Sequence, residues 1–193
     1  MSLATTLSVL DVARGRQQSI DLVRGRSTAS RLRQLLGRGE PVSVGRELYW
    51  PIAVIHASAA GTFWGRPWTD RVLGAVDLVT GRIGLVDLEL PPTERVEAAL
   101  EACVAARLGQ LRAEAAWHEY FRDYIDRRRK PMRPPRLAVD RIDRLWLPNH
   151  VASVDARTYL VDPLVGRVDE LSCFPHVQQM LMKGDRLGPT PGS

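Results

Sequence analysis

The sequence predicts an α+β protein built from two related helix-plus-antiparallel-sheet units joined by a long helix. The first observation is a repeated turn: VDLVTGRI (76–83) has a near-copy, VDPLVGRV (161–168). In each copy an aspartate is followed four residues later by a glycine between strand-forming residues, which is typical of a hairpin loop around a type I turn. The second observation is an upstream match between LYWPIAV (48–54) and LWLPNHV (145–151). Because chance rarely supplies both blocks in one order, we interpret them as copies of one strand–strand–turn–strand unit.

The first segment, 1–40, is predicted to be helical. It contains the related pieces DVARGR (11–16) and DLVRGR (21–26), each ending near a glycine, the usual residue just past a helix end. A third piece, STASRLRQLLG (27–37), carries a leucine stripe and is the clearest helix. Its neighbouring Arg-Gly-Arg triplets could form a basic arm that touches phosphate, but solvated helix ends are the favoured interpretation.

The second segment, 41–90, is predicted to be the first antiparallel β unit. The run ELYWPIAVIHAS (47–58) is rich in β-branched and aromatic residues and indicates a strand, with Pro51 at its start, an edge or a bulge. GTFWGRPWTDR (61–71) is predicted to be a loop, followed by strands over 72–76 and 83–88. The span from proline to turn aspartate is 26 residues here and 14 in the second copy, so the loop looks like an insertion.

The remaining segments follow from periodicity and proline content. Residues 91–130 show apolar residues near a 3.6-residue period and are predicted to form the long helix, with a kink or break at Gly109. Residues 131–137 are predicted to be a basic, proline-rich linker, and 138–173 the second antiparallel β unit. Residues 174–193 should form a short helix and a disordered tail.

Composition indicates an ordinary soluble globular protein, with 45% hydrophobic residues, 25% charged residues and a net charge of +5. Of the 27 basic residues only Lys130 and Lys183 are lysines, a bias that indicates either a GC-rich coding sequence, the favoured explanation, or a need for guanidinium chemistry. The charge permits an acidic partner without requiring one. Cys103 and Cys173 give no disulfide framework, and neither a signal peptide nor a membrane-spanning stretch is visible. We expect a cytoplasmic bacterial protein.

The aromatic residues of the predicted loop are the leading candidates for a protein contact. Phe63, Trp64 and Trp68 are costly to leave in water, so they either fold back over the sheet or form a contact surface. A contact surface there, together with the first hairpin, predicts a non-enzymatic binding or adaptor protein whose partner is another protein of unknown identity.

A basic run offers an alternative function. Six cations in ten residues could bind a nucleic acid or an anionic surface, although a solvated helix end leading into a stiff linker is the simpler interpretation. The candidate residues are Arg127, Arg128, Arg129, Lys130, Arg133 and Arg136.

An enzymatic interpretation finds little support. Cys173 and His176 stand three apart and His150 could approach them, but structural zinc needs four ligands, and only one close pair is visible. Standard catalytic and nucleotide-binding motifs do not occur. We therefore expect no catalytic residue, metal or cofactor.

The same residues resemble PepSY-type modules, in which a helix precedes strands that end in a Val-Asp-x-x-x-Gly hairpin. The resemblance covers residues 30–88, through STASRLRQLLG, LYWPIAVIHA and VLGAVDLVTGRIGLV, and roughly 93–172 with the long helix as leader. It implies a non-catalytic binding module. Such modules are usually extracytoplasmic and are thought to bind or inhibit peptidases, so the cytoplasmic location expected here departs from the family pattern.

Overall fold

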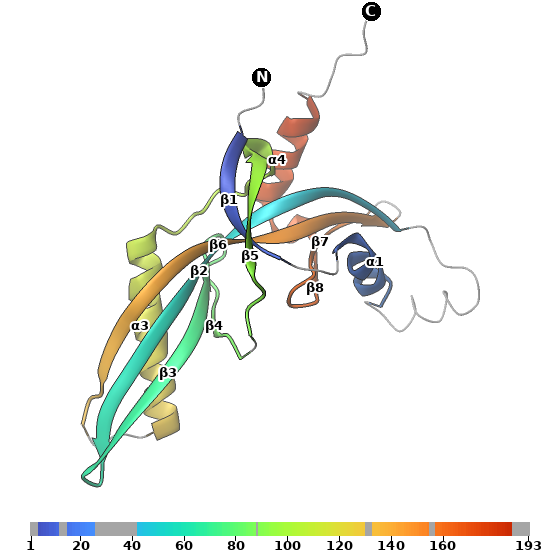
Figure 1. Ribbon diagram of the computed structural model, residues 1–193. Helices are drawn as coiled ribbons and strands as arrows, with labels where there is room; N and C mark the ends of the chain where they lie inside the picture. Colours follow the sequence, from blue (N-terminus) through green and yellow to red (C-terminus); the bar gives the residue numbers. More distant parts are fainter. Residues whose placement is uncertain are drawn as a thin grey trace, which may run out of the picture. The chain divides into compact units, whose positions relative to one another are not determined.

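A computed structural model describes residues 4–11, 15–25, 42–87, 89–129, 133–154 and 157–186. The protein is mixed α+β, with mostly antiparallel strands (Figure 1). The strands are β1 Ala4–Leu10, β2 Val42–Phe63, β3 Arg66–Asp77, β4 Ile83–Leu85, β5 Thr93–Ala99, β6 Arg136–Val154, β7 Arg157–Asp162 and β8 Arg167–Glu170. The helices are α1 Gly15–Gly25, α3 Gln110–Arg129 and α4 Pro175–Arg186, with short 3-10 turns at η1 Leu100–Ala102 and η2 Leu171–Cys173.

The chain divides into two compact units that are discontinuous in sequence. Unit 1 comprises Met1–Trp50, Pro91–Val104 and Leu147–Ser193, and unit 2 comprises Pro51–Leu90 and Ala105–Trp146. The long strands β2 and β6 each contribute residues to both units. The compact units therefore cut across the contiguous segments expected from the sequence.

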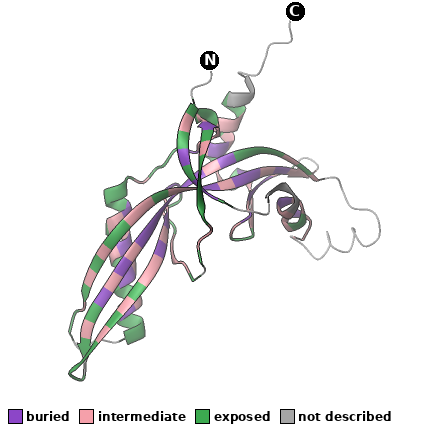
Figure 2. Ribbon diagram, in the orientation of Figure 1, coloured by how far each residue is buried: buried purple, intermediate pink, exposed green. Residues whose placement is uncertain are grey.

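Unit 2 is a sheet of strands in the order β4–β3–β2–β6, with α3 packed on one face. β2 and β3 form a continuous antiparallel ribbon from the pair Ile52↔Asp77 to the pair Phe63↔Arg66. Alternate residues of β2 are buried against α3, and Figure 2 shows the buried positions of the ribbon and helix. The helix supplies residues spaced four apart, which place one apolar stripe toward the sheet: Ala113, Trp117, Phe121 and Ile125.

Unit 1 contains the pair β1–β5 and the hairpins that join the end of β6 to β7 and β7 to β8. β1 and β5 run antiparallel from Ala4↔Ala99 to Leu10↔Thr93. A small buried cluster brings Val23 of α1 together with Ala152, Tyr159 and Val161. Helix α1 is thus fixed on β7 by apolar contact.

The first predicted turn has the expected chemistry. Asp77 Oδ1 accepts hydrogen bonds from the N–H groups of Val79 at 2.8 Å and Thr80 at 3.0 Å. The Gly81 N–H donates to the Asp77 carbonyl at 2.8 Å, and Gly81 has φ +76°. Glycine reaches this φ without steric conflict, so the turn prediction at 77–81 is confirmed.

The second turn repeats this arrangement. Asp162 Oδ1 accepts from the N–H groups of Leu164 at 2.9 Å and Val165 at 3.1 Å, and Gly166 has φ +73°. The strand registers also correspond: Ala53↔Val76 and Val76↔Ile83 flank the first turn, as His150↔Val161 and Val161↔Val168 flank the second.

Two expectations about the first β unit were wrong in detail. The segment 61–71 is not a loop, because β2 continues to Phe63, β3 begins at Arg66, and the turn consists of Trp64 and Gly65 alone. Both turn residues have positive φ, +50° and +75°, which matches the right-handed twist of a two-residue hairpin. The third strand is shorter than expected, Ile83–Leu85 instead of 83–88.

The helical predictions also need correction. The long helix begins at Gln110 and not near residue 93, because Thr93–Ala99 pairs with β1 as a strand, and Gly109 precedes the helix instead of kinking it. In the N-terminal segment Ala4–Leu10 is a strand, α1 covers Gly15–Gly25, and the helix expected over 27–37 lies outside the described residues. Within the described part of the chain, the helices lack the length and apolar character needed to cross a membrane.

Candidate functional site

The tip of the β2–β3 hairpin exposes the side chain of Trp64. Trp64 is 78% exposed and occupies the first of the two turn positions. Phe63 pairs with Arg66 at the end of the ladder, while its side chain lies outside the described part of the structure. A largely exposed tryptophan at a tightly defined turn is the kind of residue that forms the centre of a protein interface.

Trp68 has a different environment from Trp64. It is only partly exposed and packs against the core between the sheet and α3. Its ring lies over its cross-strand partner Gly61, where a Cβ atom would stand 2.8 Å from the indole. The Arg129 guanidinium lies 5.7 Å from the ring centroid, within cation–π range. The three aromatic candidates are thus not one surface, since Trp68 anchors the ribbon that carries Trp64.

An ion pair fixes the end of α3 to the same ribbon. Arg129 donates to Asp70 through Nε at 2.8 Å and Nη2 at 2.6 Å, a two-pronged geometry that is stronger than a single contact. The Arg129 hydrogen bond lowers the pKa of the Asp70 carboxyl from its ordinary value. The strand β3 is therefore braced on α3 close to the hairpin tip.

The basic run is divided by its local partners. Arg127 faces Asp123 at 3.5 Å, Arg129 faces Asp70, and Arg128 donates instead to the Tyr124 hydroxyl at 2.6 Å. Among the described residues, Arg128 therefore forms no direct ion pair with a carboxylate, although its charge helps Arg129 to lower the pKa of Asp70. Arg133 and Arg136 are exposed, and Lys130 lies outside the described residues.

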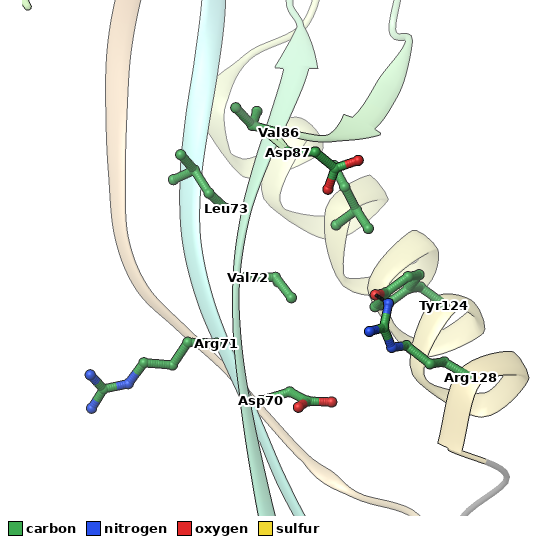
Figure 3. A pocket seen from close by; sticks show the side chains of 9 residues that line it. Asp70, Arg71, Val72, Leu73, Val86, Asp87, Tyr124 and Arg128 are labelled. Atoms are coloured by element: carbon green, nitrogen blue, oxygen red, sulfur yellow. Dashed lines mark hydrogen bonds between the residues drawn. The ribbon is translucent and has the colours of Figure 1, made fainter. Parts of the chain in front are cut away.

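A groove of about 260 Å³ opens between β3, the end of β4 and α3. Figure 3 shows Asp70, Tyr124 and Arg128 gathered at one end of the groove and Asp87 at the other, while the Arg71 side chain points away from the helix. The groove combines main chain from a strand with a tyrosine and an arginine from a helix. Sequence reasoning missed the groove because its two walls, β3 and α3, are far apart along the chain. The neighbouring Asp70 and Arg129, for example, are separated by 59 residues.

The histidine and cysteine considered for an enzymatic role have separate surroundings described by their own contacts. His150 is buried, its Nδ1 lies 2.9 Å from Ser19 Oγ, and its Nε2 lies 3.9 Å from Glu47. Ser19 is fully buried, and His150 is 5% exposed. Cys173 is an exposed free thiol on η2. Within the described residues, no group of three or more histidine, cysteine or acidic side chains could hold a metal ion.

A second hollow, of about 320 Å³, lies beside His150 in unit 1. It is acidic, since Asp11, Glu47 and Glu94 line it together with Tyr49. Burial, and next the neighbouring Glu47 carboxylate, raise the pKa of Tyr49 to about 12. Tyr49 therefore stays a neutral hydroxyl in this hollow at physiological pH.

A polar cluster occupies β2 and β6 in unit 2 and was also missed. His56 Nε2 lies 3.2 Å from Asp143, which pairs with Arg141 at 2.7 Å, and Ser58 donates to Asp140 at 3.2 Å. The alternation of His56 and Ser58 with the buried Ile55 and Ala57 is the sequence signal that could have identified it.

Comparison with known proteins adds no relative: no protein-family model matches the chain, and no curated protein or solved structure matches it.

Proposed function

We propose that this chain is a non-enzymatic binding or adaptor protein that contacts another protein through the tip of the β2–β3 hairpin. The observation that carries the proposal is the 78% exposure of Trp64 at a defined two-residue turn. Tryptophan is enriched among the residues that dominate binding energy, because one side chain buries a large area with few rotatable bonds.

The surroundings of Trp64 support this role. The ribbon behind the turn is braced by Trp68 packing on Gly61 and by the Arg129–Asp70 ion pair. A braced tip loses less conformational entropy on binding than a flexible loop, and more of the contact energy remains as affinity. Trp68 contributes by holding the tip, and Phe63 stays a proposed contact residue beside Trp64.

The resemblance to PepSY-type modules implies the same class of function, a binding module without catalysis. We place the protein in the cytoplasm as part of this proposal, and the free thiols of Cys103 and Cys173 suit a reducing compartment.

We also infer that the chain arose by duplication of a β–α–β–β–β unit. The described elements read β1, α1, β2, β3, β4 and then β5, α3, β6, β7, β8, with matching turns at 77–81 and 162–166. Val165 is 69% exposed and corresponds to Thr80, whose hydroxyl donates to the Asp77 carboxylate. Val165→Thr should therefore keep the fold, with a melting temperature no lower than that of wild type, and a clear loss of melting temperature would contradict the equivalence of the turns.

Nucleic-acid or anionic-surface binding is the alternative proposal. Arg128, Arg133 and Arg136 make no ion pair among the described residues, which leaves them available to phosphate. Phosphate contacts of this kind weaken steeply with salt, so this alternative requires salt-sensitive binding of labelled DNA or RNA.

The proposal is tested by comparing Trp64→Ala with a matched exposed position. Leu111 on α3 is 82% exposed, so Leu111→Ala removes a comparable apolar contact away from the tip. In quantitative pull-downs from cells that express the chain natively, we expect Trp64→Ala to lower recovery of specific protein partners at least tenfold. Leu111→Ala should not lower it, and both variants should melt within about 2 °C of wild type. Equal recovery by wild type and Trp64→Ala would refute the contact.

A further inference from the structure

Among the described residues, no strand pairs with the outer edge of β3 over more than half of its length. β4 pairs only with Gly74, Ala75 and Val76, and the chain then adds one bond, from the Val86 N–H to the Leu73 carbonyl at 2.8 Å. On the other side β2 pairs with β3 along its whole length. The stretch from Arg66 to Val72 is therefore an edge.

The direction of the main-chain groups on this edge follows from the bonds already made. The Asp77 N–H donates to Arg82 at 2.8 Å and the Leu73 carbonyl accepts from Val86, so both residues face the β4 side. The β2–β3 register runs without interruption, and orientation alternates along a strand, so Arg71 and Thr69 face the same way. Their N–H and C=O groups find no main-chain partner among the described residues.

The groove beside this edge supplies side-chain contacts. Tyr124 and Arg128 of α3 line it next to Asp70. Asp70 is already paired with Arg129, whereas Arg128 bonds only the neutral Tyr124 hydroxyl. The tip end of the groove thus has an excess positive charge on Arg128, while Asp87 lies at the β4 end (Figure 3).

We propose that the edge of β3 binds an extended segment of the partner protein, which adds to the sheet as a strand and places an acidic side chain against Arg128. This inference rests on the proposed protein-binding function and names the form of the partner. Strand addition takes its affinity from main-chain bonds, here the four groups of Thr69 and Arg71, and its specificity from alternate side chains. Pro67, which has no N–H, ends the pairable stretch toward the tip.

A second copy of this chain fits the edge less well. Antiparallel self-pairing centred on Arg71 or on Asp70 sets that residue opposite itself, and like charges directly opposite each other are destabilising. An acidic extended segment has no such repulsion, and it places a complementary charge against Arg128.

The test uses a displayed library of random twelve-residue peptides, selected on wild type and on two single variants. Arg71→Pro removes an outward N–H without removing a bond to β2, and Arg71→Ala is its matched control, because it keeps the N–H and loses the side chain. We expect wild type and Arg71→Ala to enrich acidic sequences with alternating β-branched residues, and Arg71→Pro to recover them at least tenfold less.

Two measurements on the best enriched peptide are independent of whether Arg71→Pro folds normally. Saturating peptide should slow exchange of the Thr69 and Arg71 amide protons at least tenfold, while the Asp70 and Val72 amides, which face β2, change little. Two versions of the peptide are compared, one N-methylated at its odd-numbered amides and the other at its even-numbered amides. Only one version should lose binding, because alternate amides of an added strand face β3.

Several results would overturn the inference. These are no enrichment of peptides on wild type, equal recovery of peptides on Arg71→Pro, unchanged amide exchange at Thr69 and Arg71, or self-association of the chain that Arg71→Pro removes.

Trp64→Ala should bind the peptide as wild type does. If Trp64→Ala captures partners as well as wild type does while the peptide still binds, the tip contact alone is refuted. If Trp64→Ala lowers partner capture but no peptide binds the edge of β3, strand addition alone is refuted.

Discussion

Gly74 provides the sharpest test of how the β3 ribbon packs on α3. A methyl group at position 74 would overlap Cη2 and Cζ3 of Trp117 and stand 2.8 Å from Cζ2. Trp117 is fully buried and stacks on Phe121 at a centroid distance of 5.5 Å, so its ring has little room to move. Overpacking of a filled core typically costs about 1–3 kcal/mol, and we place Gly74→Ala at the upper end, about 3 kcal/mol.

The matched control is Gly84→Ala on the neighbouring strand β4. A Cβ atom at Gly84 meets nothing within 4 Å, so this variant should be neutral or stabilised by less than about 1 kcal/mol. For a chain of this length 3 kcal/mol corresponds to roughly 6–12 °C in melting temperature. Thermal and urea unfolding followed by tryptophan fluorescence measure the difference.

A second substitution checks the cause. The overlapping atoms all belong to the six-membered part of the indole, so Trp117→Phe should relieve the clash and make Gly74→Ala less destabilising in the double variant than alone. The packing argument fails if Gly74→Ala and Gly84→Ala melt together, or if the two substitutions at 74 and 117 simply add.

Three further predictions concern other parts of the chain. Asp77→Ala removes two side-chain bonds to turn amides and should lower the free energy of unfolding by about 1 kcal/mol, which urea titration would detect. Because the pKa of Asp70 is lowered in the fold, its ion pair stabilises the protein above the ordinary value of 3.8 and loses this effect as pH falls through the lowered pKa. Asp70→Asn should therefore show a smaller loss of melting temperature than wild type when pH is lowered below about 4. Burial raises the pKa of the Cys103 thiol, so iodoacetamide at pH 8 should modify the exposed Cys173 several-fold faster, and equal rates by peptide mass spectrometry would contradict the burial of Cys103.

The two hairpin turns could be predicted because their chemistry is local. The aspartate accepts hydrogen bonds from the amides two and three residues later, and the glycine four residues later takes positive φ. Five consecutive residues therefore contain every interaction that defines the turn. The same local logic fails at the tryptophan turn, since Trp64 adopts φ +50°, which few non-glycine residues do. Gly65 beside it was the available signal for a two-residue turn, and the extra residues of the first copy lengthen strands instead of forming a loop.

Strand β5 shows the opposite problem, tertiary structure overriding local preference. Its sequence TERVEAA is rich in glutamate and alanine, which favour helices, yet it pairs with β1 nearly ninety residues earlier in the chain, as in Leu7↔Val96. The candidate site depends on equally distant contacts. Arg129 meets Asp70 across 59 residues and Ser19 meets His150 across 131, and no local pattern indicates either pair.

The sharing of β2 and β6 between the two units bears on how the chain can be made. Residues 51–146 contain everything that unit 2 needs, so its sheet and helix can come together while the end of the chain is still being synthesised. Unit 1 draws on both ends of the sequence, and α1 waits for β7, which begins at Arg157. During synthesis from the N-terminus, β1 can pair with β5 once Thr93–Ala99 has emerged, whereas α1 must remain unassembled until β7 emerges, because a long-range contact forms only when both partners are present. A ribosome stalled far enough beyond residue 146 for that residue to have left the exit tunnel would therefore present the whole of unit 2 before unit 1 can be completed.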